Sequence, residues 1–114
     1  LVTEKTGPLL QVTLFWQAKQ PLGEDYTVFA HVVDGQGRLV AQRDSQPVGG
    51  YRPTRGWQVG EVVEDHLGIV IPADRQGEKL RLRLGLYRPT DGRRLDILDG
   101  QGKTVGDYRE LDLP

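Results

Sequence analysis

The sequence contains no cysteine, no methionine and no asparagine. Without cysteine the chain forms no disulfide, carries no thiolate ligand for a metal and has no cysteine nucleophile. Without asparagine it has no N-glycosylation sequon. A chain that begins with leucine and lacks methionine throughout is expected to be a piece of a longer protein.

Two further features are missing. The net charge is only −1 and acidic and basic residues are interspersed, which argues against a nucleic-acid partner because phosphate binding requires a basic face. The local arginines at 81, 83, 88, 93 and 94 are interpreted as a solvated strand face. No stretch approaches the ~20 apolar residues of a membrane span, so we expect no direct membrane insertion by this segment.

What the sequence has instead is a succession of short alternating stretches separated by Gly, Pro and Asp. The 114 residues are enough for one domain, with 1–8 as a lead-in from an upstream segment. Residues 25–47 read as two strands joined by the turn Asp34-Gly35-Gln36-Gly37. Both faces of the first strand are partly apolar, so its buried face stays open. The same four letters recur at 99–102, predicting a second hairpin from 94 to 111.

The alternation predicts which side chains face the core. The clearest case is Leu80, Leu82, Leu84 and Leu86, which share one face only if the backbone is extended. Two other strands are expected, with inward sets at Leu10, Val12, Leu14 and Trp16 and at Val63, Leu67, Ile69 and Ile71. No segment shows a helical period. The sequence therefore predicts an all-β fold, an immunoglobulin-like antiparallel β-sandwich of about seven strands, with a small closed barrel as the alternative.

The stretch 47–60 lacks alternation and is predicted to be a long loop, which is where binding residues are often found. Its aromatic and basic residues suggest a ligand-binding site for sugars, because aromatic faces stack on sugar rings and arginines bind hydroxyl or acidic groups. The candidate residues are Tyr51, Arg52, Arg55 and Trp57. The alternative is that Trp57 closes one end of the sandwich and Tyr51 packs over Pro53.

Catalytic and metal-binding signals are weak. The single serine, Ser45, lacks a nucleophile-elbow pattern, and no spacing places His31 or His66 beside it. Glycosidase carboxylates would have to come from Glu61, Glu64 and Asp65, which read better as solvated strand-face charges. Each DGQG turn offers one aspartate, whereas a Ca²⁺ site needs roughly six to eight oxygens. We expect no catalytic residues, no metal site and no cofactor.

Several short stretches resemble a known domain. They are 26–34 (YTVFAHVVD), 37–47 (GRLVAQRDSQP), Trp57 with 60–63 (GEVV), 71–74 (IPAD) and 84–87 (LGLY). Together they are similar to a β-sandwich domain at the C-terminal end of large bacterial membrane proteins related to glycosyltransferases of the dolichyl-phosphate-mannose mannosyltransferase type. The resemblance covers roughly residues 10–107, carries no catalytic signature and brings no binding residues with it.

This resemblance implies an extracytoplasmic accessory domain, at the cell surface or in the periplasm, attached to a membrane-anchored protein. Two functions are expected for such a module. It binds glycan or cell-surface polymer through the 48–60 loop, or it packs against the membrane or catalytic region of its parent protein through a sheet face or exposed edge. In both cases we expect a protein that is not an enzyme.

Overall fold

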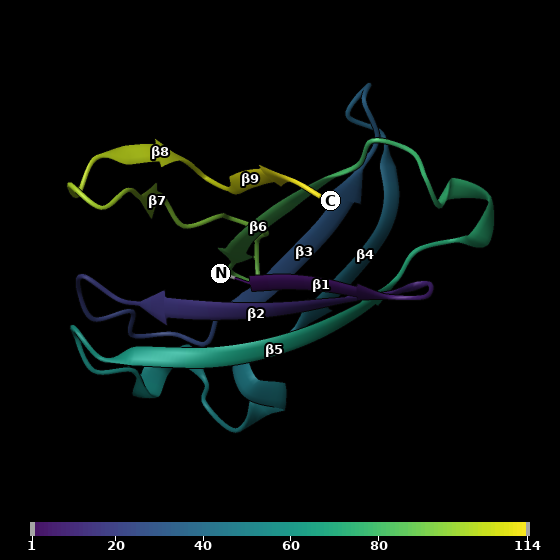
Figure 1. Ribbon diagram of the computed structural model, residues 1–114. Coiled ribbons are helices and arrows are strands. Elements are labelled where there is room, and N and C mark those ends of the chain that lie inside the picture. Colours follow the sequence, from purple (N-terminus) through teal and green to yellow (C-terminus); the bar gives the residue numbers. More distant parts are fainter. Residues whose placement is uncertain (1, 114) are drawn as a thin grey trace.

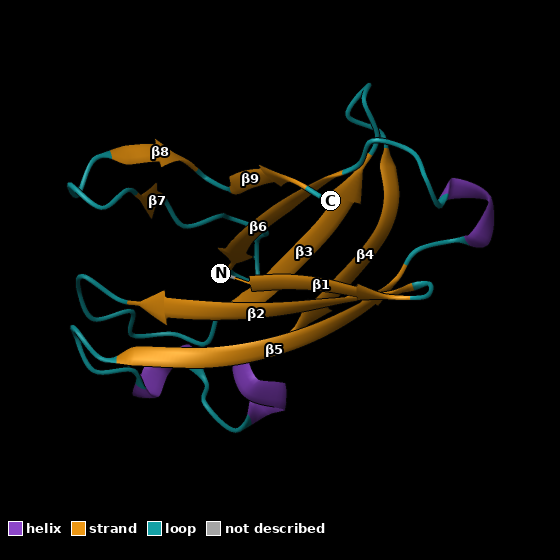
Figure 2. Cartoon of the chain, viewed as in Figure 1, coloured by secondary structure: helices purple, strands orange, loops and turns teal. Residues whose placement is uncertain are grey.

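The computed structural model describes residues 2–113 and shows a β-sandwich made of antiparallel sheets (Figures 1 and 2). The all-β prediction is confirmed. The first sheet has the order β1-β2-β5 and the second the order β4-β3-β6-β9, with β7 and β8 forming a separate hairpin. The strands are β1 (Val2–Thr6), β2 (Leu9–Gln17), β3 (Thr27–Val33), β4 (Leu39–Ser45), β5 (Val62–Val70), β6 (Arg81–Tyr87), β7 (Ile97–Leu98), β8 (Thr104–Gly106) and β9 (Arg109–Asp112).

The strand count exceeds the seven expected, because short segments also pair. Residues 2–6, expected only as a lead-in, form β1, which pairs with β2 along its whole length. The second hairpin is shorter than predicted and contains β7 and β8, while β9 returns to pair with β6. The helical segments among residues 2–113 are three 3₁₀ turns, η1 (Pro47–Gly50), η2 (Thr54–Gly56) and η3 (Ala73–Arg75).

The core lies between the two large sheets. The four leucines at 80–86 are all buried there, as the alternation predicted. They face the buried side chains of Leu10, Val12 and Leu14 on β2 and of Leu67 and Ile69 on β5. The predicted faces of β2, β5 and β6 are therefore confirmed, and their burial removes enough apolar surface from water to hold the two sheets together.

Strand β3 is buried on both faces. Val28, Ala30 and Val32 point into the core between the sheets. Phe29 points the other way and is still only 1% exposed, because the guanidinium carbon of Arg94 lies 4.4 Å from its ring centroid and Gly85 lies beside it on β6. The segment that follows β6 thus covers part of the outer face of the second sheet, which explains why periodicity alone could not assign one buried face to this strand.

The two DGQG segments fold in the same way. In each turn one aspartate oxygen accepts two backbone N–H bonds, from Gln36 and Arg38 at Asp34 and from Gln101 and Lys103 at Asp99, all at 2.9 Å. The final glycines have φ values of 78° and 80°, in the left-handed region that glycine adopts without a steric penalty. The prediction of hairpin turns is confirmed at both positions.

Residues 2–113 contain neither a membrane-spanning helix nor a group of side chains that could bind a metal ion. None of their helices combines the length and apolar character that crossing a bilayer requires. Their His, Asp and Glu side chains form no cluster of three or more that could hold a metal ion.

Candidate functional site

The long loop between β4 and β5 is fixed to the segment 24–26 by hydrogen bonds. Thr54 at its centre is fully buried. Its hydroxyl donates to the carbonyl of Glu24 at 2.6 Å and accepts from the backbone N–H of Tyr26 at 2.8 Å. Gly60 N–H, at the end of the loop, donates to the carbonyl of Ala18 at 3.0 Å. These hydrogen bonds hold the loop in a fixed position at one end of the sandwich.

The start of the loop is held by a buried carboxylate. Asp65 on β5 is fully buried, and its Oδ1 accepts the backbone N–H of Val48 at 2.9 Å. Val48 has φ 54° and ψ 41°, a left-handed conformation that is strained for a β-branched residue. The bond to Asp65 compensates part of that strain. The interpretation of Asp65 as a solvated strand-face charge is therefore wrong. Asp65 alternates with the buried Val63 and Leu67, so it lies on the inner face of β5.

Trp57 lies in a small second core. It is 7% exposed and packs with Ala18 and Val63, and the half-buried Trp16, Leu22 and Val48 lie against the same cluster. Its indole Nε1–H donates to the carbonyl of Arg52 at 2.8 Å. The indole ring therefore closes one end of the sandwich, the arrangement given above as the alternative, and offers little surface for stacking on a sugar.

The other three predicted loop residues have separate surroundings. Tyr51 is 87% exposed and does not pack over Pro53. Arg52 pairs with Glu61 at 2.7 Å, and Arg55 pairs with Asp25 at 3.1 Å. The backbone N–H of Gln58, followed by the Arg52 guanidinium, lowers the pKa of Glu61. The structure thus engages two of the four side chains in ion pairs and buries a third, and a site formed by all four stays a prediction.

The candidate catalytic residues are not arranged for joint chemistry. Ser45 Oγ is buried with no hydrogen-bond partner among residues 2–113. Glu64 and Asp65 are consecutive on β5 and point to opposite faces of the sheet, one exposed and one buried. His66 lies on the exposed face, 2.7 Å from Glu64 Oε2 and 3.2 Å from Thr13 Oγ1. Burial lowers the pKa of His31, the second histidine.

The arginines of the C-terminal half are not simply solvated. Arg81 and Arg83 both bind Glu110 on the neighbouring strand, and the Arg83 guanidinium lowers the pKa of that carboxyl group. Arg88 binds Asp91 and Glu24 at 2.8 and 3.1 Å, and Asp91 contributes most to its raised pKa. These arginines, which we interpreted as a solvated strand face, instead connect strands and turns through ion pairs.

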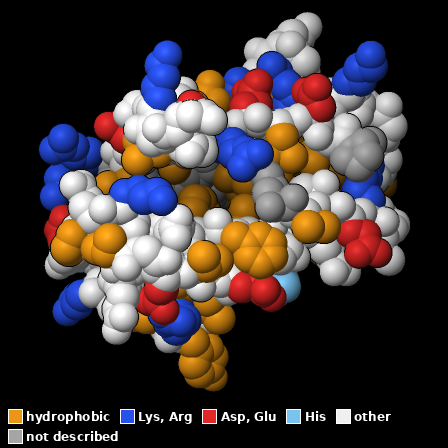
Figure 3. Space-filling view, turned by 60° about the vertical axis from the view of Figure 1, so that its left-hand side comes forward, with side chains coloured by type: hydrophobic (Ala, Val, Ile, Leu, Met, Phe, Trp, Pro, Cys, Tyr) orange, Lys and Arg blue, Asp and Glu red, His pale blue; other side chains and the backbone are white. Residues whose placement is uncertain are grey.

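A cleft opens at the end of the sandwich next to Trp57. It has a volume of about 1010 Å³. We call this space the inter-sheet cleft. Its lining consists of residues 14–20, 93–100 and Arg109, with Leu22, Tyr26, Trp57, Leu84, Leu86, Arg88 and Gly102. Figure 3 faces this end of the molecule and shows a hollow with apolar side chains in its depth and basic side chains around it.

The cleft exists because the chain leaves the second sheet and returns to it. Leu95 N–H donates to the carbonyl of Leu86 at 2.9 Å, and Arg109 pairs in register with Leu84. Between these two points the β7–β8 hairpin extends away from the sheet edge (Figure 1). Residues 95–100 of this excursion line the cleft opposite β2, and Leu95 also packs against the core.

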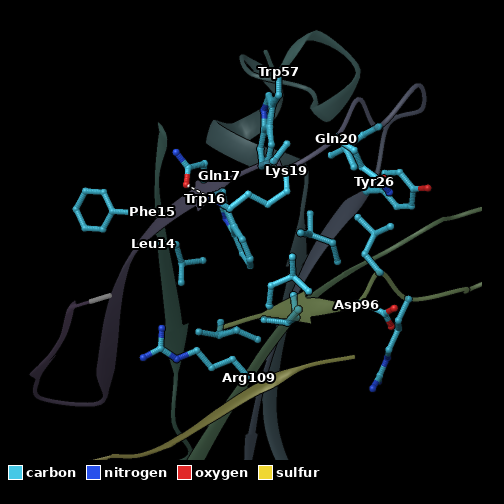
Figure 4. A pocket seen from close by; sticks show the side chains of 18 of the residues that line it. Leu14, Phe15, Trp16, Gln17, Lys19, Gln20, Tyr26, Trp57, Asp96 and Arg109 are labelled. Atoms are coloured by element: carbon cyan, nitrogen blue, oxygen red, sulfur yellow. Dashed lines mark hydrogen bonds between the residues drawn. The ribbon is translucent and has the colours of Figure 1, made fainter. Parts of the chain in front are cut away.

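Figure 4 shows the side chains around the cleft. Trp16 lies on the β2 side, Arg109 on the β9 side and Trp57 beyond Trp16, while Phe15 points away from the space. Trp16, predicted as core, packs against the core and also lines the cleft. Apart from Trp57, the loop residues that sequence reasoning selected do not line it.

No known protein family matches the chain, and no curated protein or solved structure matches it either.

Proposed function

We propose that this chain is a non-catalytic accessory module of a larger membrane-associated protein, an immunoglobulin-like sandwich outside the cytoplasm that binds glycan or cell-surface polymer. The observation that supports the proposal is the inter-sheet cleft. It has a volume of about 1010 Å³, and of the aromatic residues that line it, Trp16 is half-buried whereas Tyr26 and Trp57 are buried. Binding sites for small molecules and sugar units are usually concave surfaces of this kind, with aromatic walls and a few polar groups at the rim.

The rim of the cleft supplies polar groups suited to sugar hydroxyls. Lys19 and Gln17 are hydrogen-bonded to each other at 2.8 Å, and Gln17 also donates to the carbonyl of Gly60 at 2.7 Å. These bonds fix the rim side chains before a ligand arrives, which lowers the conformational entropy lost on binding. Trp16 is half-buried, so part of its ring remains available to a ligand that enters the cleft.

The absence of catalysis is part of the proposal. It is supported by the opposite orientation of Glu64 and Asp65 on β5 and by the isolation of Ser45 Oγ. Acid–base hydrolysis of a glycosidic bond needs two carboxyl groups that flank the same bond. We expect no turnover on a broad panel of glycosides and esters.

A glycan array with the purified chain tests the proposal. We expect binding to at least one class of glycan, strongly reduced in Trp16→Leu and retained in Tyr51→Ala, which removes an exposed ring outside the cleft. Both variants must first show the cooperative melting of the unmodified chain. If Tyr51→Ala alone lost binding, the binding site would lie in the 48–60 loop instead of the cleft. If the chain bound no glycan at all, the proposal would be overturned.

A second function is favoured by the outer face of the first sheet. Val62 and Val70 on β5 and Phe15 on β2 are 60%, 66% and 50% exposed on that face. Glu64 and His66 lie between the two valines on the same face, so it is a mixed surface of exposed apolar and charged side chains, as at many protein contact surfaces. In this alternative the module has no ligand and packs against its parent through this face. Phe15→Ser would then leave the melting of the module unchanged but weaken its association with the rest of the parent protein, as measured by co-purification.

A further inference from the structure

Charge is distributed unevenly around the inter-sheet cleft. Five basic side chains line it, Lys19, Arg88, Arg93, Arg94 and Arg109, against two acidic ones, Asp96 and Asp99. The chain as a whole has 15 basic and 16 acidic residues. The cleft is therefore enriched in positive charge relative to the rest of the protein.

Some of this charge is already neutralised. Arg88 binds Asp91 and Glu24, and Arg94 lies 3.6 Å from Asp107. Among the acidic residues, Asp99 is engaged by two backbone N–H groups of its own turn. Within the described part of the chain, neither Arg93 nor Arg109 makes an ion pair with a carboxylate. The charge of Arg93 still acts on Asp91 and helps to lower the pKa of that carboxyl group, after the larger effect of Arg88. Arg109 is thus the cleft arginine without a carboxylate partner among the described residues, and Asp96 is a cleft acid that makes no ion pair there.

Arg109 occupies an unusual position. It pairs with Leu84 on β6, and the next pair on the same face of the sheet is Leu111 with Leu82. Leu82 and Leu84 are both inward and buried, so position 109 belongs to the inner face of the sandwich, where residues are normally apolar. Figure 4 shows the Arg109 side chain in the cleft, on the side opposite Trp57. Arg109 is nevertheless exposed to solvent, so its guanidinium is hydrated in the cleft and is available to an anion that enters the same space.

We propose that the ligand of the inter-sheet cleft is an acidic glycan whose sugar carboxylate binds Arg109. This inference rests on the glycan-binding function proposed above and specifies its ligand. A guanidinium binds a planar carboxylate through two parallel hydrogen bonds. Trp16 lies on the β2 side of the same space, and the proposal assigns its half-buried ring to the sugar that carries the carboxylate. Arg93 adds a second positive charge for a neighbouring acidic unit of the polymer.

The experiment compares matched ligands and matched variants. The ligands are uronic-acid oligosaccharides and their methyl esters, which differ only in the charge of the carboxyl group, on an array that also carries neutral glycans. The variants are Arg109→Gln in the cleft, Arg55→Gln in the long loop and Arg43→Gln, an exposed arginine outside both sites. Arg109→Gln keeps a polar side chain at an exposed position, so we expect it to fold.

We expect the acid form to bind at least ten-fold more tightly than its ester, and Arg109→Gln to remove that preference while Arg55→Gln and Arg43→Gln keep it. A ten-fold change is the size expected when a charge-assisted hydrogen bond is lost. Affinity for the acid form should also fall as salt is added. Equal binding of acid and ester, or a panel in which the bound glycans are neutral, overturns this inference and leaves the glycan-binding function standing. No binding to any glycan overturns both.

Discussion

Replacing Gly85 with alanine tests the packing between β3 and β6. Gly85 is the one residue between Leu84 and Leu86 in the leucine strand, and it pairs in register with Phe29. A Cβ atom at position 85 would lie 2.5 Å from both Cε2 and Cζ of Phe29 and 3.0 Å from the carbonyl oxygen of Asp107. Carbon atoms in contact normally lie ~3.5–4.0 Å apart, so the Phe29 ring would have to move by about 1 Å.

The ring has little room for that movement. Phe29 is 1% exposed, with the Arg94 guanidinium at 4.4 Å and the His31 ring at 5.0 Å from its centroid. Overpacking of a filled site typically costs about 1–3 kcal/mol, and we place Gly85→Ala in the upper half of that range, near ~2–3 kcal/mol. For a domain of nearly this size each kcal/mol lowers the melting temperature by roughly 4 °C or more.

Urea unfolding and thermal melting measure this loss, and Gly100→Ala is the matched control. A Cβ at Gly100 meets no atom within 4 Å and its φ is not in the left-handed region, so this variant should unfold at the same urea concentration as the unmodified chain, within about 0.5 kcal/mol. Phe29→Leu removes the clashing ring atoms. The double variant Gly85→Ala, Phe29→Leu should therefore lose less free energy of unfolding than the two single variants lose together, by ~1 kcal/mol or more. Equal stabilities of Gly85→Ala and Gly100→Ala, or strict additivity in the cycle, would refute the packing described here.

Two carboxylates give further predictions. The backbone N–H of Arg38 is the largest cause that lowers the pKa of Asp34 to about 2, from 3.8. The stabilising effect of the ionised Asp34 carboxylate is therefore complete above about pH 4 and is lost as the pH falls toward 2. The difference in free energy of unfolding between the unmodified chain and Asp34→Asn should shrink over that interval, and a constant difference would contradict this prediction. Asp65→Ala leaves the Val48 N–H without an acceptor and should lower the free energy of unfolding by about 1–3 kcal/mol in urea, while Asp65→Asn, which keeps an acceptor oxygen, should lose less.

The strands and turns follow from local patterns in the sequence. Leu80 to Leu86 alternate with polar or small residues, and extended backbone puts them on one face whatever the partner strand is. The DGQG turns are equally local, because the aspartate carboxylate, the two N–H groups it accepts and the final glycine lie within five consecutive residues. These features could be predicted because neighbours in sequence determine them.

The features that were missed depend on residues distant in sequence. Phe29 is buried because Gly85 and Arg94 pack against its ring, and the alternation of residues within β3 does not predict this contact. For Trp57 the sequence left two roles open, a sugar-stacking ring or the closure of one end of the sandwich, and the structure shows the second, because the ring packs on Ala18 and Val63. A tryptophan in a loop can stack on a sugar or can close the end of a sandwich. Because both roles use the same residue type in the same kind of segment, the sequence alone does not distinguish them.

Arg109 illustrates the same limit and also explains the cleft. In the sequence it belongs to a short polar stretch, and the pairing with Leu84 is what places it on the inner face. A leucine there would only add apolar surface to the β9 side of the cleft, beside Leu84. An arginine in that position requires access to water or to an anion. The open end of the sandwich and the inward cation are therefore one structural feature, and a ligand that fits the cleft must suit both its apolar walls and its positive charge.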